Sequence, residues 1–317
     1  MRRVALVLAL SAVAFAQKPP FLHLERASNT PILGPQGDGW ESAGVFNPAA
    51  ILTNNKIVML YRAQDKKGTS RIGYAESADG VRFHRDASPV LSPEAIYEKD
   101  GGVEDPRLVR IGDLYYLTYT AYNTKDAQLA LATSPDLRHW DRKGVILPAY
   151  KGRWNIGWTK SGAILDRKIG GKYWMYFMAD AKDRPGQMGV ASSEDLVHWT
   201  EPLDGPVAPT RPGKFDSKVA EPGPPPILID AGILLIYNGA DDQLLYRTGW
   251  LLFDPKDPTR VLARSDTPVI APVNEWEKVG QVPNVVFVEG MVQRGADWLF
   301  YYGGADKYVG VARPVVR

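Results

Sequence analysis

The sequence predicts an all-β fold, specifically a five-bladed β-propeller, from three observations. One phrase recurs along the chain: an apolar and aromatic strand, a short polar turn, and a second strand that in the first three copies runs into Ser-x-Asp. Gly, Asp, Asn and Pro separate roughly four short strands in each unit, and no long stretch shows helical periodicity. All-β repeats of fixed period build radial blades or a solenoid, and four strands in each of five units favour a propeller.

Five copies of the phrase follow one another. Their first strands are expected at residues 57–64, 115–122, 173–180, 233–241 and 298–306. A tyrosine marks the equivalent point of each copy, at Tyr61, Tyr119, Tyr176, Tyr237 and Tyr302, with intervals of 58, 57, 61 and 65 residues by subtraction of these numbers. Because the repeat covers the chain after its N-terminal segment, we expect one domain over residues 17–317. A two-sheet sandwich with appended domains is the competing architecture.

A second strand follows the first strand in each copy of the repeat. These second strands are expected at residues 72–83, 129–140, 188–199, 244–261 and 308–316, of which the fourth is the most divergent. In the second and third copies the ending extends to Ser-x-Asp-x-x-x-Trp, at Ser134–Trp140 and Ser193–Trp199. Aspartate at such a position turns the backbone through side-chain hydrogen bonds, so we expect a structural role for these endings, with the tryptophan packed between blades.

The first sixteen residues, MRRVALVLALSAVAFA, are built like a secretory signal peptide. Two arginines precede an apolar run of about ten residues, and Ala14-Phe15-Ala16 supplies a cleavage site. The run is too short to span a bilayer, which argues against a membrane anchor. We therefore expect residues 1–16 to be removed and the protein to be exported to the periplasm or beyond, with no membrane association afterwards.

Composition excludes several kinds of chemistry. Removal of Arg2 and Arg3 takes the formal charge from +2 to 0, which leaves no basic field for nucleic acid and suits a neutral ligand. The chain has no cysteine, so disulfides, thiolate nucleophiles and cysteine-bound metals are excluded. Its four histidines lack zinc-ligand spacing, and we expect neither metal nor cofactor. Catalysis then falls to carboxylates.

One run of residues departs from the other copies. Glu104-Asp105-Pro106-Arg107 stands directly before an apolar strand, and no sibling strand begins with two acids. In a propeller this position faces the mouth of the central channel. Adjacent carboxylates repel, so one is held protonated or is fixed by Arg107 as an ion pair, an environment that suits a general acid. The alternative is a structural ion pair between Glu104 and Arg107, with Asp105 capping a turn.

Three further departures carry polar residues. Glu221 precedes a stiff Pro-Gly-Pro-Pro-Pro run, which either holds the carboxylate in place or blunts a sheet edge beside a solvated glutamate. Lys160 lies between aromatic and small residues, where it contacts a ligand oxygen or extends along the rim. Asp306 occupies the position of Asp180 and Asp241, so the three either ring the channel or share a turn role.

Eight phrases of the sequence together resemble glycoside hydrolase family 130. They are FNPAA at Phe46, YRA at Tyr61, GVEDPR at Gly102, GKYWMY at Gly171, PGPPPI at Pro222, IYNGAD at Ile236, VPNVVF at Val282 and YYGGAD at Tyr301. They occur in the expected order over nearly the whole chain after residue 16. The resemblance implies a five-bladed β-propeller that acts on β-mannosides with inversion, by phosphorolysis or by hydrolysis.

The resemblance also implies roles for individual residues. Asp105 matches the family's general acid, whose proton travels through the 3-hydroxyl of the bound mannose. The residues expected to bind the mannose before the cleaved bond are Asn47, Arg62, Arg107 and Asp306, to which we add Glu104 from the acid pair.

Two departures from the family's phosphorylases predict hydrolysis. In the segment WTKSGAILDRKIGGKYWMYFMAD, Lys160 is retained, but Trp158 replaces one arginine of the phosphorylase pattern and Met178 stands near the place of another. Phosphate recognition needs clustered cations that make charge-assisted hydrogen bonds. Where phosphorylases have a lysine and a glycine-rich run, this chain has Glu221, which would repel an anion.

An inverting hydrolase needs a base opposite its acid, with the two carboxyls about 6.5 to 9.5 Å apart. We therefore predict an inverting β-mannosidase that uses Asp105 as acid and Glu221 as base on β-1,2-linked manno-oligosaccharides. Trp158 and Lys160 complete the predicted binding residues. Glu277 is a candidate for a second base, with a structural role as its alternative.

Three other functions stay open. A mannosyl phosphorylase would recruit phosphate through Lys160 and Arg153 or Arg211. A carbohydrate-binding propeller would use the acids only to hydrogen-bond sugar hydroxyls. A five-bladed hydrolase of the arabinanase type fits poorly, because its early aspartate base and late glutamate acid would lie on other blades. The sequence predicts no oligomeric state.

Overall fold

Antiparallel strands joined by short turns make up nearly all of the regular structure, which a computed structural model describes for residues 23–182 and 184–315. Its helices are single turns, η1 (Ile96–Glu98) and α1 (Glu275–Lys278). The predicted all-β class is confirmed. The predicted signal peptide, residues 1–16, lies outside the described residues. Within the described ranges, no helix is long and apolar enough to cross a membrane.

The strands of the described residues form four sheets. The largest contains β2 (Gly44–Thr53), β3 (Lys56–Gln64), β4 (Ser70–Ser77), β5 (His84–Arg85), β6 (Gly102–Ile111), β7 (Leu114–Tyr122), β8 (Ala127–Ser134) and β9 (Asp141–Leu147). The next contains β10 (Thr159–Ile164), β11 (Tyr173–Ala181) and β12 (Arg184–Ser193). A third contains β13 (Val219–Pro222), β14 (Ile227–Ile229), β15 (Gly232–Ala240), β16 (Tyr246–Phe253) and β17 (Val261–Arg264). The last contains β1 (Leu24–Arg26), β18 (Val286–Arg294), β19 (Asp297–Gly304) and β20 (Tyr308–Pro314).

The largest sheet is two groups of strands held together at one place. Strands β2 to β5 and strands β6 to β9 each form an antiparallel set, and a single parallel pair, Ser70 with Gly102, joins β4 to β6. Each of the five predicted first strands coincides with an observed strand: β3, β7, β11, β15 and β19. The described residues form four sheets, more than the two that a sandwich core alone would contain.

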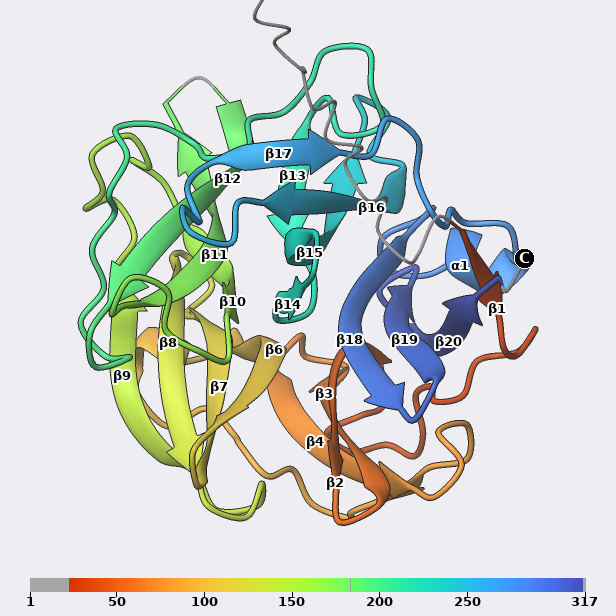
Figure 1. Cartoon of the computed structure of the whole chain (residues 1–317). Coiled ribbons are helices and arrows are strands. Elements are labelled where there is room, and N and C mark those ends of the chain that lie inside the picture. Colours follow the sequence, from red (N-terminus) through yellow and green to blue (C-terminus); the bar gives the residue numbers. More distant parts are fainter. Residues whose placement is uncertain (1–22, 183, 316–317) are drawn as a thin grey trace, which may run out of the picture.

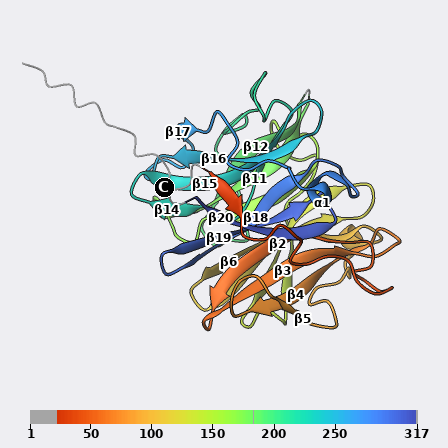
Figure 2. The same cartoon turned by 90° about the vertical axis from the view of Figure 1, so that its right-hand side faces the viewer.

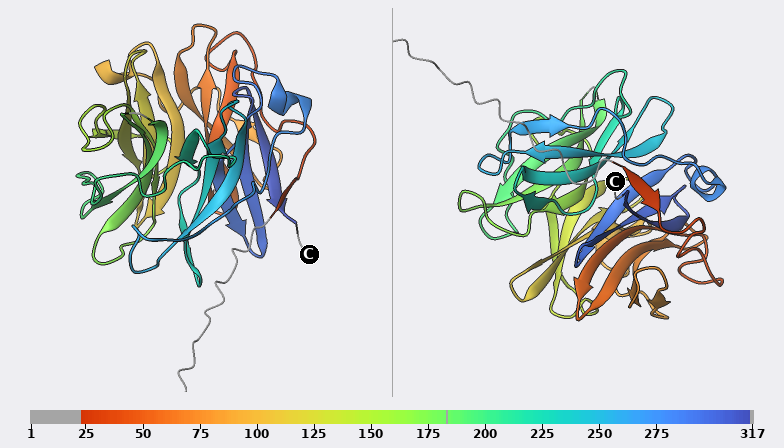
Figure 3. Two further views of the ribbon diagram at one scale, coloured as in Figure 1. Left: turned by 90° about the horizontal axis from the view of Figure 1, so that it is seen from above. Right: turned by 45° about the vertical axis from the view of Figure 1, so that its right-hand side comes forward.

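The sheets follow one another around the middle of the molecule, where β6, β10 and β18 lie (Figure 1). Contacts run from β2 to β6, from β6 to β10, from β10 to β13, from β15 to β18, and from β18 back to β2. Figure 2 shows β2 to β5 and β15 to β17 on opposite sides of the molecule. Strand β1 lies beside β20, so the N-terminal strand completes the C-terminal sheet (Figure 3). Strands β2, β6, β10, β13 and β18 thus converge where a ligand site can draw on several sheets.

The repeated tyrosines have a shared structural role in four of the five copies. Each donates its buried hydroxyl to a carboxylate that also binds an arginine. The sets are Tyr61–Glu41–Arg85, Tyr119–Glu98–Arg142, Tyr237–Asp216–Arg264 and Tyr302–Glu277–Arg26. In the remaining copy, Tyr176 donates to the backbone oxygen of Pro258 instead. The period seen in the sequence therefore marks a buried polar link between strand and loop.

This difference predicts unequal stability effects. Tyr119→Phe removes the donor to the buried carboxylate of Glu98, and we expect a loss of about 1.5–3 kcal/mol in the free energy of unfolding, the usual range for a hydrogen bond to a charged group. Tyr176→Phe removes a bond to a neutral carbonyl and should lose only about 0.5–1.5 kcal/mol. Urea denaturation of both variants measures the difference. Equal losses would show that the charge of Glu98 contributes nothing to the bond.

Candidate active site

Four strands that each precede one of the predicted first strands, namely β2, β6, β10 and β18, are distorted at an equivalent point. The register shifts between Phe46 and Pro48, between Glu104 and Arg107, between Lys160 and Ala163, and between Val288 and Gly290. The residues inside these bulges include Asn47, Asp105, Ser161 and Glu289. The first three have left-handed backbones with φ of 48°, 49° and 62°. Bulges re-aim side chains out of the regular alternation, and Asn and Asp tolerate this conformation best among residues with a side chain.

Several of these strands contribute to a pocket of about 110 Å³. Its lining residues are Asn47, Arg62, Asp105, Lys160, Glu221, Tyr246, Val282, Val285, Phe287 and Asp306. Six of the nine predicted site residues are therefore brought together, although they are up to 259 positions apart in the chain by subtraction of 47 from 306. In particular, Asp105 and Glu221, predicted as acid and base, line the same pocket.

Asp105 is held on one wall by two donors. The side-chain amide of Asn47 lies 2.8 Å from Oδ1, and Arg62 Nη1 lies 3.0 Å from the same oxygen. Burial alone would raise the pKa of Asp105, but Arg62, Lys160 and Arg107 outweigh it and lower the pKa to about 2. The carboxyl is therefore ionised at neutral pH in the ligand-free site.

Glu104 lies behind this wall and does not line the pocket. Arg62 Nη2 binds its Oε1 at 2.6 Å, and the hydroxyl of Ser70 donates to the same oxygen at 3.0 Å. Burial raises the pKa of Glu104, and Arg62 opposes that shift only in part. The predicted ion pair between Glu104 and Arg107 is wrong, because Arg62 takes the place of Arg107. Glu104 thus orients Arg62 and is not placed to touch a ligand in this pocket.

Arg107 also departs from its predicted role in mannose binding. Its side chain is 1% exposed and does not line the pocket. The guanidinium instead donates to the backbone oxygens of Asp105 at 3.0 Å and Pro222 at 2.9 Å, and lies beside Glu289. A cation that is buried among such partners has no free donor face for a sugar, so the role of Arg107 is internal.

Glu221 lies in strand β13 rather than in the stiff loop that the prolines suggest. It is paired with Asn238 of β15, and the proline run follows it. The hydroxyl of Ser161 donates to its Oε1, and Lys160 Nζ lies 3.7 Å from that oxygen. Glu221 is the main cause of a raised pKa at Lys160, which stays charged. One cation and one hydroxyl therefore hold this carboxylate.

The glycine after this strand end permits a close approach. A Cβ at Gly223 would lie 2.5 Å from the backbone oxygen of Val288 and 2.8 Å from that of Ile236. Because no side chain fits there, Gly223 lets the strand that bears Glu221 press against β18.

Asp306 is the third acid of the pocket. Burial raises its pKa to about 6, although Arg62 opposes the shift. The predicted ring of three equivalent acids is wrong, because the other two are turn residues. Asp180 accepts the backbone N–H of Gly186, and Asp241 accepts those of Gln243 and Leu245.

The raised pKa of Asp306 predicts a pH-dependent stability. The folded protein holds a proton on this carboxyl up to about pH 6, whereas the unfolded chain releases it near 3.8, so the stabilisation is complete below pH 4 and is lost as the pH rises through 6. Between pH 4 and 7.5 the wild type should lose about 2–3 kcal/mol of unfolding free energy more than Asp306→Asn, which has no such proton. Urea denaturation at both pH values measures this. Parallel changes in the two proteins would contradict the assignment.

Four other residues considered in the sequence lie outside the pocket. Trp158 donates its indole N–H to the hydroxyl of Tyr150 at 3.0 Å and packs edge-on against Tyr122. Arg153 pairs with Asp204, and Arg211 pairs with Asp216. Neither arginine therefore supplies the pocket with a phosphate ligand.

The remaining one, Glu277, is a structural residue. It is fully buried, accepts the backbone N–H groups of Val273 and Asn274, and binds Arg26 at 2.7 Å. Its oxygens are thus occupied by structural partners, and it does not line the pocket that contains Asp105.

Sequence reasoning missed Tyr246, Phe287 and Glu289. Burial raises the pKa of Tyr246 to about 12, with Glu221 adding to the shift, so its hydroxyl remains a donor. Phe287 stands in the VPNVVF phrase, to which no role was given. Glu289 lies in the bulge of β18 as Asp105 lies in the bulge of β6, so an alignment of the sequences of these two strands would have found it.

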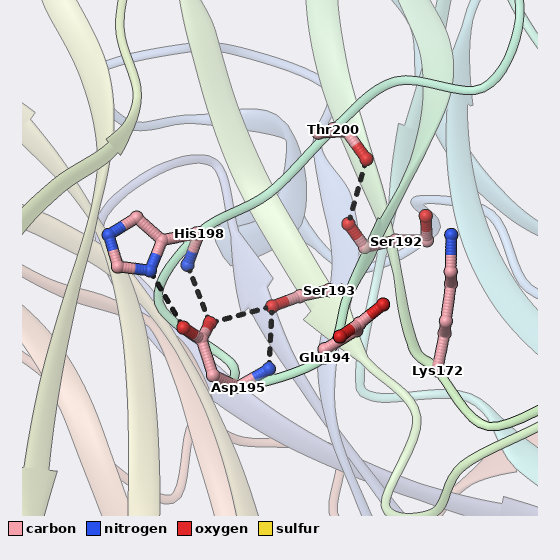
Figure 4. A pocket seen from close by; sticks show the side chains of 7 residues that line it. All are labelled: Lys172, Ser192, Ser193, Glu194, Asp195, His198 and Thr200. Carbon is pink, nitrogen blue, oxygen red and sulfur yellow. Dashed lines mark hydrogen bonds and ion pairs between the residues drawn. The ribbon is translucent and has the colours of Figure 1, made fainter.

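A larger hollow of about 360 Å³ contains a serine, an aspartate and a histidine but is not arranged for catalysis. Figure 4 shows Asp195 between Ser193 and His198, so the imidazole does not reach the hydroxyl that it would have to activate. Asp195 also accepts the backbone N–H groups of Val197 and His198, as Asp136 does for its own turn. The structural role predicted for the Ser-x-Asp endings is confirmed.

The chain is similar to known proteins over most of its length. A family model for glycoside hydrolase family 130, described as β-1,4-mannooligosaccharide phosphorylase, matches residues 26–317. A 1,2-β-oligomannan phosphorylase of Thermoanaerobacter sp. (strain X514) is 39% identical over 92% of this chain and 97% of its own. A β-1,2-mannobiose phosphorylase of the same strain is 37% identical over 91% of this chain and 96% of its own.

A solved structure is similar over a comparable length. It is 37% identical over 97% of this chain and 95% of its own, with a TM-score of 0.84. Its description states that this family of mannoside phosphorylases contains glycoside hydrolases that target β-1,2 mannosidic linkages in Candida mannan. On the extent of these matches, the chain belongs to glycoside hydrolase family 130.

Proposed function

We propose that this protein cleaves β-1,2-mannosidic bonds of oligosaccharides with inversion. The linkage is supported by two phosphorylase relatives and a solved structure whose descriptions specify β-1,2 bonds. The pocket supports the reaction, because it combines two carboxylates from different sheets, Asp105 and Glu221, with neutral and cationic donors for sugar hydroxyls.

We also propose that the five groups of strands are the blades of a β-propeller. The closed sequence of contacts from β2 through β6, β10, β13, β15 and β18 supports this, as does completion of the last group by β1. In this architecture the bulged strands β2, β6, β10 and β18 surround the channel, which accounts for the position of the pocket.

The acceptor that the geometry favours is water, and the observation that carries this is the position of Glu221. Its carboxylate lines the pocket and is held by Ser161 and Lys160. The cations that line the pocket are Lys160, beside Glu221, and Arg62, bound to Glu104 and Asp105. Phosphate would meet acids at each of these cations, whereas an uncharged water needs only a base.

The reaction then balances as follows. Glu221 takes a proton from water, whose oxygen bonds to the anomeric carbon as the bond to the glycosidic oxygen breaks. The departing oxygen receives the proton of Asp105, which the family resemblance routes through the 3-hydroxyl of the sugar. Because the carboxyl of Asp105 is ionised in the ligand-free site, the acid role requires it to take up a proton once the sugar is bound.

Phosphorolysis is the second candidate, and the relatives favour it. Both Thermoanaerobacter proteins are named phosphorylases, and the family model is described as a β-1,4-mannooligosaccharide phosphorylase. In that case, Lys160 would have to leave Glu221 and bind the phosphate. The names of the relatives thus favour phosphate as the acceptor, whereas the charges of the pocket favour water.

Initial rates separate the two. Purified protein is incubated with β-1,2-mannobiose and with β-1,4-mannobiose, each with and without phosphate. A phosphate concentration of about 10 mM exceeds the usual range of KM values and should saturate the site. We expect mannose release from the β-1,2 disaccharide at the same rate in both buffers. A rate that is negligible without phosphate would assign the phosphorylase reaction, and preference for the β-1,4 disaccharide would overturn the linkage.

Export by residues 1–16 and a single domain over residues 17–317 are also proposals, supported by the N-terminal sequence pattern and by the span of the repeat. Mass spectrometry of the protein recovered from a periplasmic fraction tests the first, with an N-terminus at Gln17 as the expected result.

A further inference from the structure

Arg107 connects the two strands that carry the proposed acid and base. Its guanidinium donates to the backbone oxygen of Asp105 in β6, and to those of Pro222 at 2.9 Å and Gly223 at 3.3 Å, which follow Glu221. Strands β6 and β13 belong to different sheets and share no ladder. The arginine therefore spans a junction at which backbone pairing does not fix the spacing.

Glu289 of β18 is the carboxylate beside this arginine. Its side chain is 0% exposed, and Oε1 lies 2.8 Å from Arg107 Nη1. Among the described residues, neither carboxyl oxygen has a partner in well-aligned hydrogen-bond geometry. Burial raises the pKa of Glu289 well above its usual range, and Arg107 opposes the shift.

These contacts distinguish Glu289 from the buried glutamates that stabilise the fold. Glu98 and Glu277 each accept a tyrosine hydroxyl and two backbone N–H groups besides binding an arginine. Glu289 has no such set, and a buried ion pair without further hydrogen bonds contributes little net stability. The stability of the fold therefore does not explain why Glu289 is placed against Arg107.

The third side of the junction is rigid. Asn238 Nδ2 donates to the backbone oxygen of Val288, and its Oδ1 accepts the N–H of Val288, both at 2.9 Å. Gly223 abuts the same oxygen of Val288. Strand β18 thus presents Glu289 from a fixed position, against which the arginine can be set.

We propose that Glu289 is a positioning residue that holds Arg107, and that Arg107 in turn sets the distance between Asp105 and Glu221. The inference rests on the proposed function for these two carboxylates. Because displacement of a reacting group by about 1 Å can cost on the order of a hundredfold in rate, a loosened arginine should lower turnover far more than it lowers sugar binding.

The kinetic test compares four variants. Glu289→Leu and Arg107→Lys should each lower kcat for β-1,2-mannobiose by on the order of a hundredfold, with KM nearly unchanged. Lysine keeps the charge but cannot reach three carbonyls at once. Glu289→Gln retains an acceptor for the arginine and should keep a kcat close to that of the wild type. Glu277→Leu is the matched control, since it also removes a buried carboxylate from an arginine, and its folded fraction should keep normal kcat.

Rates are referred to the folded fraction measured by circular dichroism. If Glu289→Leu does not fold, Arg107→Lys carries the test, because its ion pair is preserved. Wild-type kcat in Arg107→Lys, or an equal fall of kcat in Glu277→Leu, would overturn the proposal.

A structural readout separates this inference from the proposed function. In a crystal structure of Arg107→Lys, the backbone oxygens of Asp105 and Pro222 should lie measurably farther apart than in the wild type. Unchanged positions would overturn the positioning role whatever the activity. If the wild-type protein cleaves no β-mannoside with either acceptor, the proposed function fails, while the crystal comparison still decides the role of Arg107.

Discussion

Asp105→Asn is expected to lower kcat for β-1,2-mannobiose by roughly 10²- to 10⁴-fold, the usual contribution of a general acid, while the melting temperature stays close to that of the wild type. The fold should persist because the side-chain oxygen of asparagine still accepts from Asn47 and Arg62. Steady-state rates of mannose release measure the loss.

The leaving group provides a sharper version of this experiment. The nitrophenolate group of a nitrophenyl β-mannoside leaves without being protonated, so Asp105→Asn should retain much more of its activity on that substrate. Asp306 is the competing acid, because it lines the same pocket and its pKa of about 6 leaves it partly protonated near neutral pH. If Asp306→Asn abolishes the reaction and Asp105→Asn does not, the acid is Asp306.

Glu221→Gln is expected to abolish hydrolysis, with a fall in kcat of roughly 10²- to 10⁴-fold for loss of the base. Glutamine still accepts from Ser161, so the pocket should keep its shape. Azide needs no deprotonation and should restore turnover by attacking the face that water attacks, giving α-mannosyl azide.

Lys160→Met is the matched control for this variant. It removes the cation beside Glu221 but leaves the base, so it should retain part of the hydrolysis and show no azide rescue. Near-normal hydrolysis in Glu221→Gln would remove Glu221 from the base role. A rate in that variant which rises with phosphate would instead support phosphorolysis.

The repeat was readable from sequence because it reflects a buried constraint. The tyrosines that mark its period lie in β3, β7, β11, β15 and β19, and four of them bind buried carboxylates. The proline run after Glu221 was misleading, since Glu221 itself lies in β13 and pairs with Asn238. Proline itself has no backbone N–H to donate, but the residue before it is biased towards the extended conformation and can still enter a ladder.

The site was only partly readable. Asp105 and Glu221 were found as acids that break the repeat, and both line the pocket. Which arginine each acid would bind could not be predicted, because that depends on how neighbouring sheets abut. Arg62 of β3 reached Glu104, and Arg107 of β6 turned towards Glu289 of β18. The contribution of Tyr246 likewise depends on the packing of distant strands.

The most direct test of the account follows the anomeric protons by NMR from the earliest minutes of a reaction with β-1,2-mannobiose, with and without phosphate. An early excess of α-mannose over its equilibrium proportion, in both buffers and before mutarotation, is the result we predict, since water activated by Glu221 attacks opposite the bond that breaks while the reducing-end mannose leaves as an equilibrium mixture. Formation of α-mannose 1-phosphate only when phosphate is present would contradict the assignment of water as the acceptor, and an early excess of β-mannose would contradict inversion itself.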